Sequence, residues 1–394
     1  MDRPDRLHAL DNLRAIMMWL GIVLHVSVNH LVTKSPLPWH DPVRSSAADL
    51  IFIFIHAFRM PVFFILAGFF VALLVAGRGV NGMLKHRLRR VGLPFLVFWP
   101  PIFIATVLLV LVYVHMMATG RPGLDASLIP LAPGQPMFST MHMWFMLYLL
   151  WFSLLTALTL RLSARLPTGL RSALAGFWKS LASSWWGFAV LAAPLAIVGA
   201  PYPGGLVAAG GSFVPNLAET VQSGLFFLLG WQLWRQRDSV LAQYTRYCWR
   251  YAAVGLLFFV CFLALASPQA RAGGKIPALN YLMPYAYNCA SWLWSFALLG
   301  IFLRYLPAQN RFLRYLSDSS YWMYLVHMLG TIGFGILLFD APLNLAQKMS
   351  VNILATTLVC LASYHLFVRC TWIGTLLNGQ RHARRPKPAL NAAA

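Results

Sequence analysis

Residues 50–76 read LIFIFIHAFRMPVFFILAGFFVALLVA, and this stretch decides the fold. A helix needs about 20 apolar residues to cross the hydrocarbon core of a bilayer. Only His56 and Arg59 bring titratable side chains into the run. Because the bilayer core holds no water, every backbone polar group there must be hydrogen-bonded within the chain, so such a run predicts a spanning α-helix.

The whole chain has the composition of a membrane protein. Of its 394 residues, 59% are hydrophobic and only 10% are charged, whereas soluble domains carry about 25% charged residues. These proportions exclude a soluble globular domain and a disordered chain, because too few polar residues are present to cover a surface. The five cysteines form no CxxC pair, which argues against a disulfide framework and against a metal site.

Nine more apolar runs accompany the first one. The ten expected spans lie at about 13–33, 50–76, 91–116, 143–160, 186–200, 219–234, 248–266, 284–303, 318–339 and 350–370. The fold class is therefore all-α, a polytopic integral membrane protein with about ten transmembrane helices. We expect residues 1–375 to form a single membrane domain and residues 376–394 to form a basic, disordered cytoplasmic tail.

The basic residues indicate how the chain is oriented. Lys and Arg number 31 against 10 Asp and Glu, a net charge of +21. With ten spans, 24 of the 31 fall on one side of the membrane and 6 on the other. Basic residues collect on the cytoplasmic side of membrane proteins, so this split places both termini in the cytoplasm. The same rule explains the excess charge, and we expect the lipid bilayer rather than nucleic acid as the partner.

Three titratable side chains within the first two spans form the main candidate site. Ionisable groups inside a bilayer are costly and need a functional reason. At 1.5 Å per residue, His25 lies about 12 Å and Arg59 about 14 Å from the outer boundary. His56 shares a helix face with Arg59 at the i, i+3 spacing. A short outer loop makes the two spans neighbours, so these three side chains are expected in one layer, facing a polar cavity or a bound anion.

Further candidates lie on both sides of that layer. Arg14 is expected at the inner rim of the first span, and Arg87 and Arg90 lie in the basic loop that follows the second span. His142 begins the fourth span, and Tyr324 and His327 lie near the middle of the ninth. A lone histidine within a span is often just a hydrogen-bonded packing residue, and Arg14, Arg87 and Arg90 also suit plain cytoplasmic anchors.

Four motifs in order resemble the membrane acyltransferase-3 family. They are LDNLR at residues 10–14 followed by His25, FIHAFRMPVFFILAGF at residues 54–69, HMWFM at residues 142–146, and SYWMYLVH at residues 320–327. The resemblance extends over roughly residues 8–375. The second motif, with RLRRVGLP at residues 87–94, is closest to the glucan-biosynthesis protein C branch of that family. The last span lacks the Glu-x-Pro that many relatives carry there.

The resemblance implies transfer of an acyl group from a cytoplasmic acyl-CoA to a hydroxyl of a periplasmic or cell-surface glycan. This branch is associated with succinylation of osmoregulated periplasmic glucans, and related branches acetylate other surface sugars. It implies a multi-pass protein of the bacterial inner membrane, with succinyl-CoA or acetyl-CoA as co-substrate and no tightly bound cofactor.

That reaction gives each candidate residue an expected role. His25 would act as general base on the acceptor hydroxyl. Arg59 would stabilise the oxyanion, with His56 or His327 as a secondary donor. Arg14, Arg87 and Arg90 would bind the phosphates of CoA, since guanidinium groups suit that task. His142, His327 and Tyr324 would form an acceptor or secondary site.

Two other classes of function remain open on the sequence alone. Ten spans with buried His and Arg also suit a secondary transporter or an exporter. Broken helices and mirrored halves in the sequence would favour that class. A b-type cytochrome would need paired axial histidines on facing helices. His56 and His142 are expected at different depths, which argues against the cytochrome.

Overall fold

The part of the chain that the structure describes consists of helices joined by loops. A computed structural model describes residues 8–33, 35, 37–128, 138–163, 165, 167–207, 210–271, 276–308 and 310–379, and none of them lies in a β-strand. The expected all-α class is confirmed. The helices are α1 (His8–Val28), α2 (Ser46–Arg87), α3 (Leu93–Thr119), α4 (Trp144–Ser163), α5 (Thr168–Ser183), α6 (Gly187–Gly199), α7 (Leu217–Arg235), α8 (Arg237–Arg271), α9 (Leu279–Tyr305), α10 (Arg311–Leu337), α11 (Leu345–Ser363) and α12 (Trp372–Asn378).

Short 3-10 and π segments join or extend these helices. They are η1 (Leu88–Gly92), η2 (Ala126–Leu128), η3 (Met141–Met143), η4 (Pro203–Gly205) and η5 (Tyr364–Val368). Of the expected cytoplasmic tail, residues 376–378 form the last turn of α12, and residues 380–394 lie outside the described residues.

Each expected apolar run lies mostly in a helix, although the runs at 13–33 and 318–339 extend past the ends of α1 and α10. Fewer helices have the length and apolarity of a span. Seven stretches of the described chain could cross a membrane, or up to eight if α5 and α6, bent by 104°, count as one. One of the seven, Ser46–Thr119, contains both α2 and α3. The run at 186–200 forms α6, a helix of only 13 residues. The run at 219–234 forms α7, where Glu219, Gln222 and Gln232 interrupt the apolar sequence.

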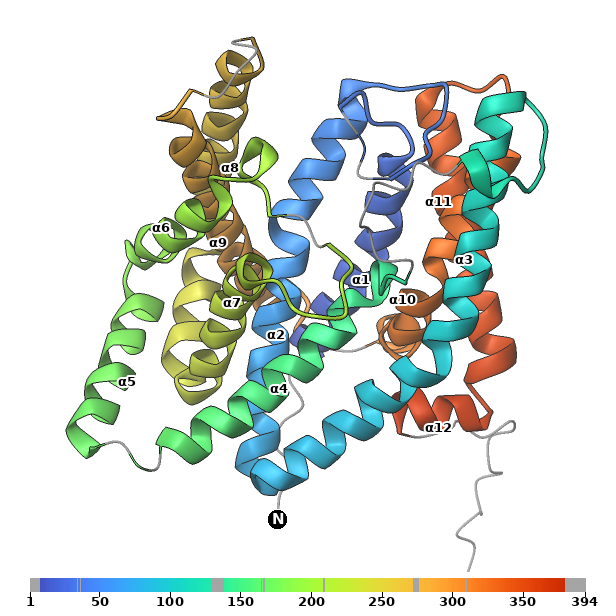
Figure 1. The fold of residues 1–394 in the computed structure, drawn as a ribbon. Helices are drawn as coiled ribbons and strands as arrows, with labels where there is room; N and C mark the ends of the chain where they lie inside the picture. Colours follow the sequence, from blue (N-terminus) through green and yellow to red (C-terminus); the bar gives the residue numbers. More distant parts are fainter. Residues whose placement is uncertain are drawn as a thin grey trace, which may run out of the picture.

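Helices α1 and α2 form the centre of the molecule. In Figure 1, α6, α8 and α9 gather on one side, α3, α10 and α11 on the other, with α1 and α2 between them. Helix α2 packs against α1, α7 and α9, and α10 packs against α1, α3 and α11. This arrangement surrounds the facing sides of α1, α2 and α10 with protein.

Two glycines allow α2 and α7 to cross backbone to backbone. A Cβ on Gly68 of α2 would lie 2.9 Å from the carbonyl carbon of Phe227, and a Cβ on Gly230 of α7 would lie 2.7 Å from that of Ile65. Small residues at such crossings are common in membrane helices because association there depends on close packing. The crossing fixes α7 and its polar residues beside α2.

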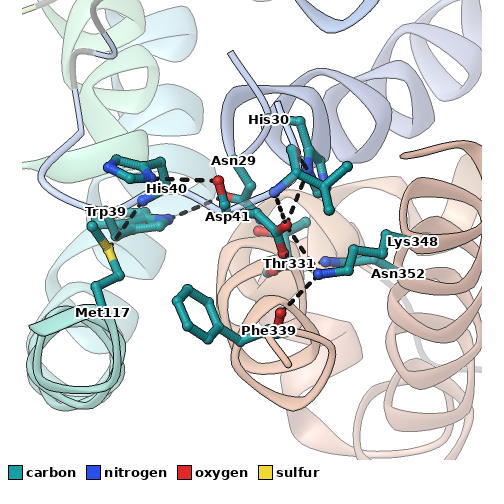
Figure 2. A network of polar contacts seen from close by, with 11 residues as sticks. Asn29, His30, Trp39, His40, Asp41, Met117, Thr331, Phe339, Lys348 and Asn352 are labelled. Carbon is teal, nitrogen blue, oxygen red and sulfur yellow. Dashed lines mark hydrogen bonds and ion pairs between the residues drawn. The ribbon is translucent and has the colours of Figure 1, made fainter. Parts of the chain in front are cut away.

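A buried ion pair closes the outer end of the α1, α10 and α11 group. The Nζ atom of Lys348 on α11 lies 3.0 Å from both carboxylate oxygens of Asp41, and it also donates to the carbonyl of Phe339 at 2.8 Å. Asp41 and Lys348 are each only 1% exposed. Figure 2 shows Asp41 between His30 and Lys348, with Asn29 and Trp39 beside them. The ion pair thus fastens the α1–α2 loop across the end of α1.

Candidate functional site

Three histidines from three separate elements meet near the outer end of α1. The His25 ring lies 5.1 Å from the ring of His327 on α10, measured between centroids. His327 in turn lies 5.3 Å from the ring of His142 in η3. His142 and His327 are buried, and His25 is half-buried. We call His25, His142 and His327 the histidine cluster.

Hydrogen bonds to carbonyl groups orient two of these rings. Nδ1 of His327 lies 3.0 Å from the carbonyl oxygen of Met323 and 2.9 Å from that of Tyr324. Nε2 of His142 lies 3.1 Å from the carbonyl oxygen of Leu325. A carbonyl only accepts, so each of these nitrogens carries a proton, and in the neutral ring the other nitrogen is left with a lone pair.

Each ring of the cluster keeps one buried nitrogen unbonded. Nδ1 of His25, Nδ1 of His142 and Nε2 of His327 have no hydrogen-bond partner among the described residues. Buried polar atoms are normally hydrogen-bonded, so an unbonded one needs a functional explanation. Nitrogens with available lone pairs can accept protons from a bound molecule.

The Arg59 guanidinium lies against α1 one helical turn inward from His25. Its Nε donates to the carbonyl of Met17 at 3.0 Å, and its Cζ lies 5.6 Å from the centre of the Phe63 ring. An added Cβ on Gly21 would lie 2.8 Å from this Cζ. Gly21 precedes His25 by four residues and so shares its face of α1. The missing side chain at Gly21 therefore makes the space that Arg59 occupies.

Tyr324 holds η3 and α10 together beneath the cluster. Its hydroxyl donates to the carbonyl of His142 at 2.8 Å. The preceding residue, Met141, has a φ of 49°, the left-handed region that a non-glycine residue seldom adopts. Such strained backbone tends to persist where the surrounding structure enforces it, and at functional sites it is common.

His56 lies on α2, and it lines a small cavity that Arg59 does not line. Its ring stacks on Phe52 with centroids 5.7 Å apart, and it lines a small cavity with residues of α7 and α9. Of the three side chains expected in one layer, Arg59 lies one turn from His25 against α1, whereas His56 lines a cavity that the other two do not line. Helix α1 ends at Val28, several residues before the expected boundary, so His25 lies in its last turn.

Arg14, Arg87 and Arg90 line one cavity of about 430 Å³, which we call the inner cavity. Residues of α1, α2, η1, α4, α10 and α12 form its walls. Arg14 pairs with Asp11 at 3.2 Å, and Nη1 of Arg90 donates to the carbonyl of Thr375 at 2.6 Å. Arg87 differs, because its buried Nε and Nη2 have no hydrogen-bond partner among the described residues. Its guanidinium is therefore the one best placed to bind an anion in this cavity.

The inner cavity reaches from these arginines to the edge of the site. Phe63 and Tyr324 also line it. Phe63 lies beneath the Arg59 guanidinium, and the Tyr324 ring lies 6.3 Å from that of His327. One continuous cavity thus connects a basic rim with the surroundings of the histidine cluster and Arg59.

Several residues that shape the site are not among those that the sequence predicts. Gly21 could have been found, because a glycine one turn before His25 on the same helix face indicates a close approach by another group. Glu219 and Gln222 of α7 lie within the expected span at 219–234, where the apolar neighbours gave no sign of a polar cavity. Among the described residues, no group of three or more His, Cys, Asp or Glu is arranged to hold a metal ion.

Comparison with known proteins identifies the class. A family model described as an acyltransferase domain matches residues 7–368, nearly the whole chain. The chain therefore belongs to the acyltransferase-3 family, and its apolar helices make it a multi-pass membrane protein.

The curated relatives point to one branch of this family. Glucans biosynthesis protein C of Escherichia coli strain K12 is 35% identical over 123 residues, 31% of each chain. The protein of the same name from Salmonella typhimurium strain LT2 is 35% identical over 148 residues, 36% of each chain. The chain thus matches about a third of the length of these relatives. No solved structure matches it.

Proposed function

We propose that this protein is an O-acyltransferase that moves an acyl group from a cytoplasmic acyl-CoA to a hydroxyl of a periplasmic or cell-surface glycan. The observation that carries the proposal is the inner cavity, which connects Arg87 with the surroundings of Arg59 and His327. A CoA molecule has phosphates at one end and the thioester at the end of a long, thin arm. The cavity offers cations at its rim, and at its other end it is lined by Phe63 and Tyr324, which contact Arg59 and His327.

His25 acts as general base in the proposed reaction. The acceptor hydroxyl gives its proton to His25 while its oxygen attacks the thioester carbonyl carbon. When the tetrahedral intermediate collapses, the C–S bond breaks and the CoA sulfur leaves, taking up the proton from His25. General base catalysis of this kind contributes about 100- to 10,000-fold.

Arg59 stabilises the oxyanion that forms on the thioester carbonyl. Preorganised donors contribute most where water is excluded, and the Arg59 side chain is only 6% exposed. Its Nε is already bonded to the carbonyl of Met17, so the terminal nitrogens are the donors for the substrate. His327 lies next to His25, and His142 lies next to His327; the two serve to position His25 or to relay its proton.

The relatives suggest the acceptor. Proteins named for glucan biosynthesis at 35% identity favour a glucan as the substrate. We propose succinyl as the acyl group, with acetyl as the alternative, and the bacterial inner membrane as the location.

The test combines cells and purified protein. Mass spectrometry of periplasmic and surface glycans from cells with and without the gene gives the acyl group and the acceptor together. The variants His25→Ala and Arg59→Ala should reduce that mass difference at least about 100-fold at normal protein levels. His365→Ala is the matched control, because His365 is exposed and lies outside the cluster.

The same variants separate the parts of the proposal. Membranes supplied with labelled succinyl-CoA or acetyl-CoA should label the glycan only when the intact protein is present. Full acylation by His25→Ala would remove that residue as the base, and unlabelled glycan with both donors would refute the proposed donor class.

A further inference from the structure

A second, smaller cavity lies on another face of α2, toward α7 and α9. It measures about 60 Å³, and residues of α2, α4, α7, α9 and the chain after η4 line it. About 10–15 Å³ is the least volume that holds one water, so a cavity of this size admits a few waters or a small polar group. We call it the outer pocket, because Gly205–Val207 lines it and follows the fifth of ten expected spans, which places it opposite the cytoplasmic termini.

The outer pocket is rich in uncharged polar groups. Nε2 of Gln222 donates to Oδ1 of Asn288 at 2.9 Å, and Nδ2 of Asn288 donates to the carbonyl of Pro284 at 2.8 Å. These bonds fix both amide groups and leave the carbonyl oxygen of Gln222 as an acceptor. Ser223 and Ser291 add buried hydroxyl groups.

The acidic residue that lines the outer pocket is held by the protein itself. Oε2 of Glu219 accepts from the Tyr148 hydroxyl at 3.0 Å, and Oε1 accepts from the backbone N–H of Gly210 at 2.8 Å. Among the lining residues only Glu219 bears a formal charge when His56 is neutral. A carboxylate in this position disfavours an anionic ligand and accepts further hydrogen bonds from hydroxyl groups.

Aromatic rings form the other walls. Trp144, Phe64 and Tyr287 line the same space. Ligand sites combine apolar and aromatic walls with a few placed polar groups. A sugar presents apolar C–H faces and hydroxyl edges, and this combination of rings with amide, hydroxyl and carboxylate groups is complementary to both.

One side chain separates the outer pocket from Arg59. Met60 lines the pocket, and its Sδ lies 3.9 Å from Nη1 of Arg59. Helix α2 turns by 100° per residue, so one of its faces carries Ala57 and Phe64 toward the outer pocket, and another carries Phe63 toward the inner cavity. His56 and Met60 lie between these two faces. A hydroxyl bound in the outer pocket is therefore one side chain away from the proposed reaction centre.

We propose that the outer pocket binds the acceptor, an uncharged polyhydroxylated sugar, by a hydroxyl-bearing arm rather than by a whole ring. Gln222, Asn288 and Ser223 bind the hydroxyls of this arm, Glu219 orients them, and the aromatic walls contact its C–H groups. The inference rests on the proposed acyltransferase function and assigns the acceptor site within it. The pocket also gives a reason for α7 to bury polar side chains, which cost free energy unless they are bonded.

The experiment uses the full-length protein in lipid nanodiscs with short glucose oligomers as acceptor and acyl-CoA as donor. Gln222→Leu and Asn288→Leu should each raise KM for the oligomer about tenfold, the size of one lost hydrogen bond near 1.4 kcal/mol. KM for acyl-CoA should stay unchanged. Ser223→Ala, the smaller change, should raise KM for the oligomer a few-fold.

Gln232→Leu is the matched control, because Gln232 is buried on the same helix and does not line the pocket. It should leave both KM values unchanged. Unchanged KM for the oligomer in all three pocket variants, or an equal rise in both KM values, would overturn the proposal.

A direct binding measurement distinguishes this proposal from the proposed reaction. Calorimetric titration of the oligomer into wild-type protein and into Asn288→Leu needs no turnover. Binding to the wild type that is lost in the variant supports the pocket, even if no acyl transfer occurs. An absence of binding to the wild type overturns the pocket, whatever becomes of the reaction.

Discussion

Gly21→Ala tests whether the place of Arg59 against α1 matters for the reaction. The new Cβ would lie 2.8 Å from Cζ of Arg59, whereas carbon atoms pack at about 3.5–4.0 Å. The Cζ atom must therefore move by at least roughly 0.7–1.2 Å, and Nη2 lies nearer still to the new Cβ. A displacement of about 1 Å at a reacting group can cost about 100-fold in rate, which corresponds to roughly 2.7 kcal/mol.

The fold should tolerate this change. The clashing atoms are the far end of a flexible side chain, and alanine is favoured over glycine within a helix by about 1 kcal/mol. We expect the melting temperature of Gly21→Ala to equal or exceed that of the wild type, while kcat for acyl transfer falls about 100-fold. Thermal unfolding in detergent and initial rates with acyl-CoA and glucose oligomers measure the two quantities.

Gly333→Ala on α10 is the control, because a Cβ there would meet no atom within 4 Å. In a background of Arg59→Ala, Gly21→Ala should have no further effect on the rate, since both changes act through the same group. Wild-type activity of Gly21→Ala would refute the role of the Arg59 position. A further loss in the double variant would show that Gly21 acts in some other way.

Three further outcomes concern stability and are measured by thermal unfolding of the purified protein. Gly230→Ala should cost about 1–3 kcal/mol, because its Cβ would lie 2.7 Å from the carbonyl carbon of Ile65, a backbone atom of α2; an unchanged melting temperature would contradict the close crossing. Lys348→Met should cost about 3–5 kcal/mol by leaving the Asp41 carboxylate buried and unpaired, and adding Asp41→Asn should restore part of the loss. Burial lowers the pKa of His30, although the Val43 carbonyl and Asp41 act in the opposite direction. As the pH drops below about 6.5, His30 therefore binds a proton in the unfolded chain before it does so in the folded protein, and the free energy of unfolding should fall. The fall should be smaller in His30→Asn, and equal pH dependence in both proteins would exclude His30 as its source.

Hydropathy predicted the helices well, because a bilayer leaves few choices. Without water, an apolar run of sufficient length must satisfy its own backbone, and each expected run is mostly helical. The run at 219–234 shows the limit of this argument. Its helix, α7, buries Glu219 and Gln232, and whether such a segment crosses the bilayer or packs inside the protein depends on neighbours that a hydropathy count does not see.

Part of the candidate site could also be predicted. His25 and Arg59 attracted attention because titratable groups within spans are costly, and the structure places Arg59 one turn from His25 on the surface of α1. The expected layer with His56 was drawn from helix boundaries alone. In the structure α1 ends at Val28, and His56 lines a cavity that neither His25 nor Arg59 lines.

The sequence by itself determined that this chain is a bundle of membrane helices, because apolarity is a property of each segment and needs no partner. Only the tertiary structure decided that His142 and His327 join His25, since these residues come from helices far apart along the chain. Likewise, the missing side chain of Gly21 and the amides of α7 and α9 gained meaning only from what packs against them. Contacts between distant segments depend on the shapes of the side chains where helices cross, and hydropathy does not describe those shapes.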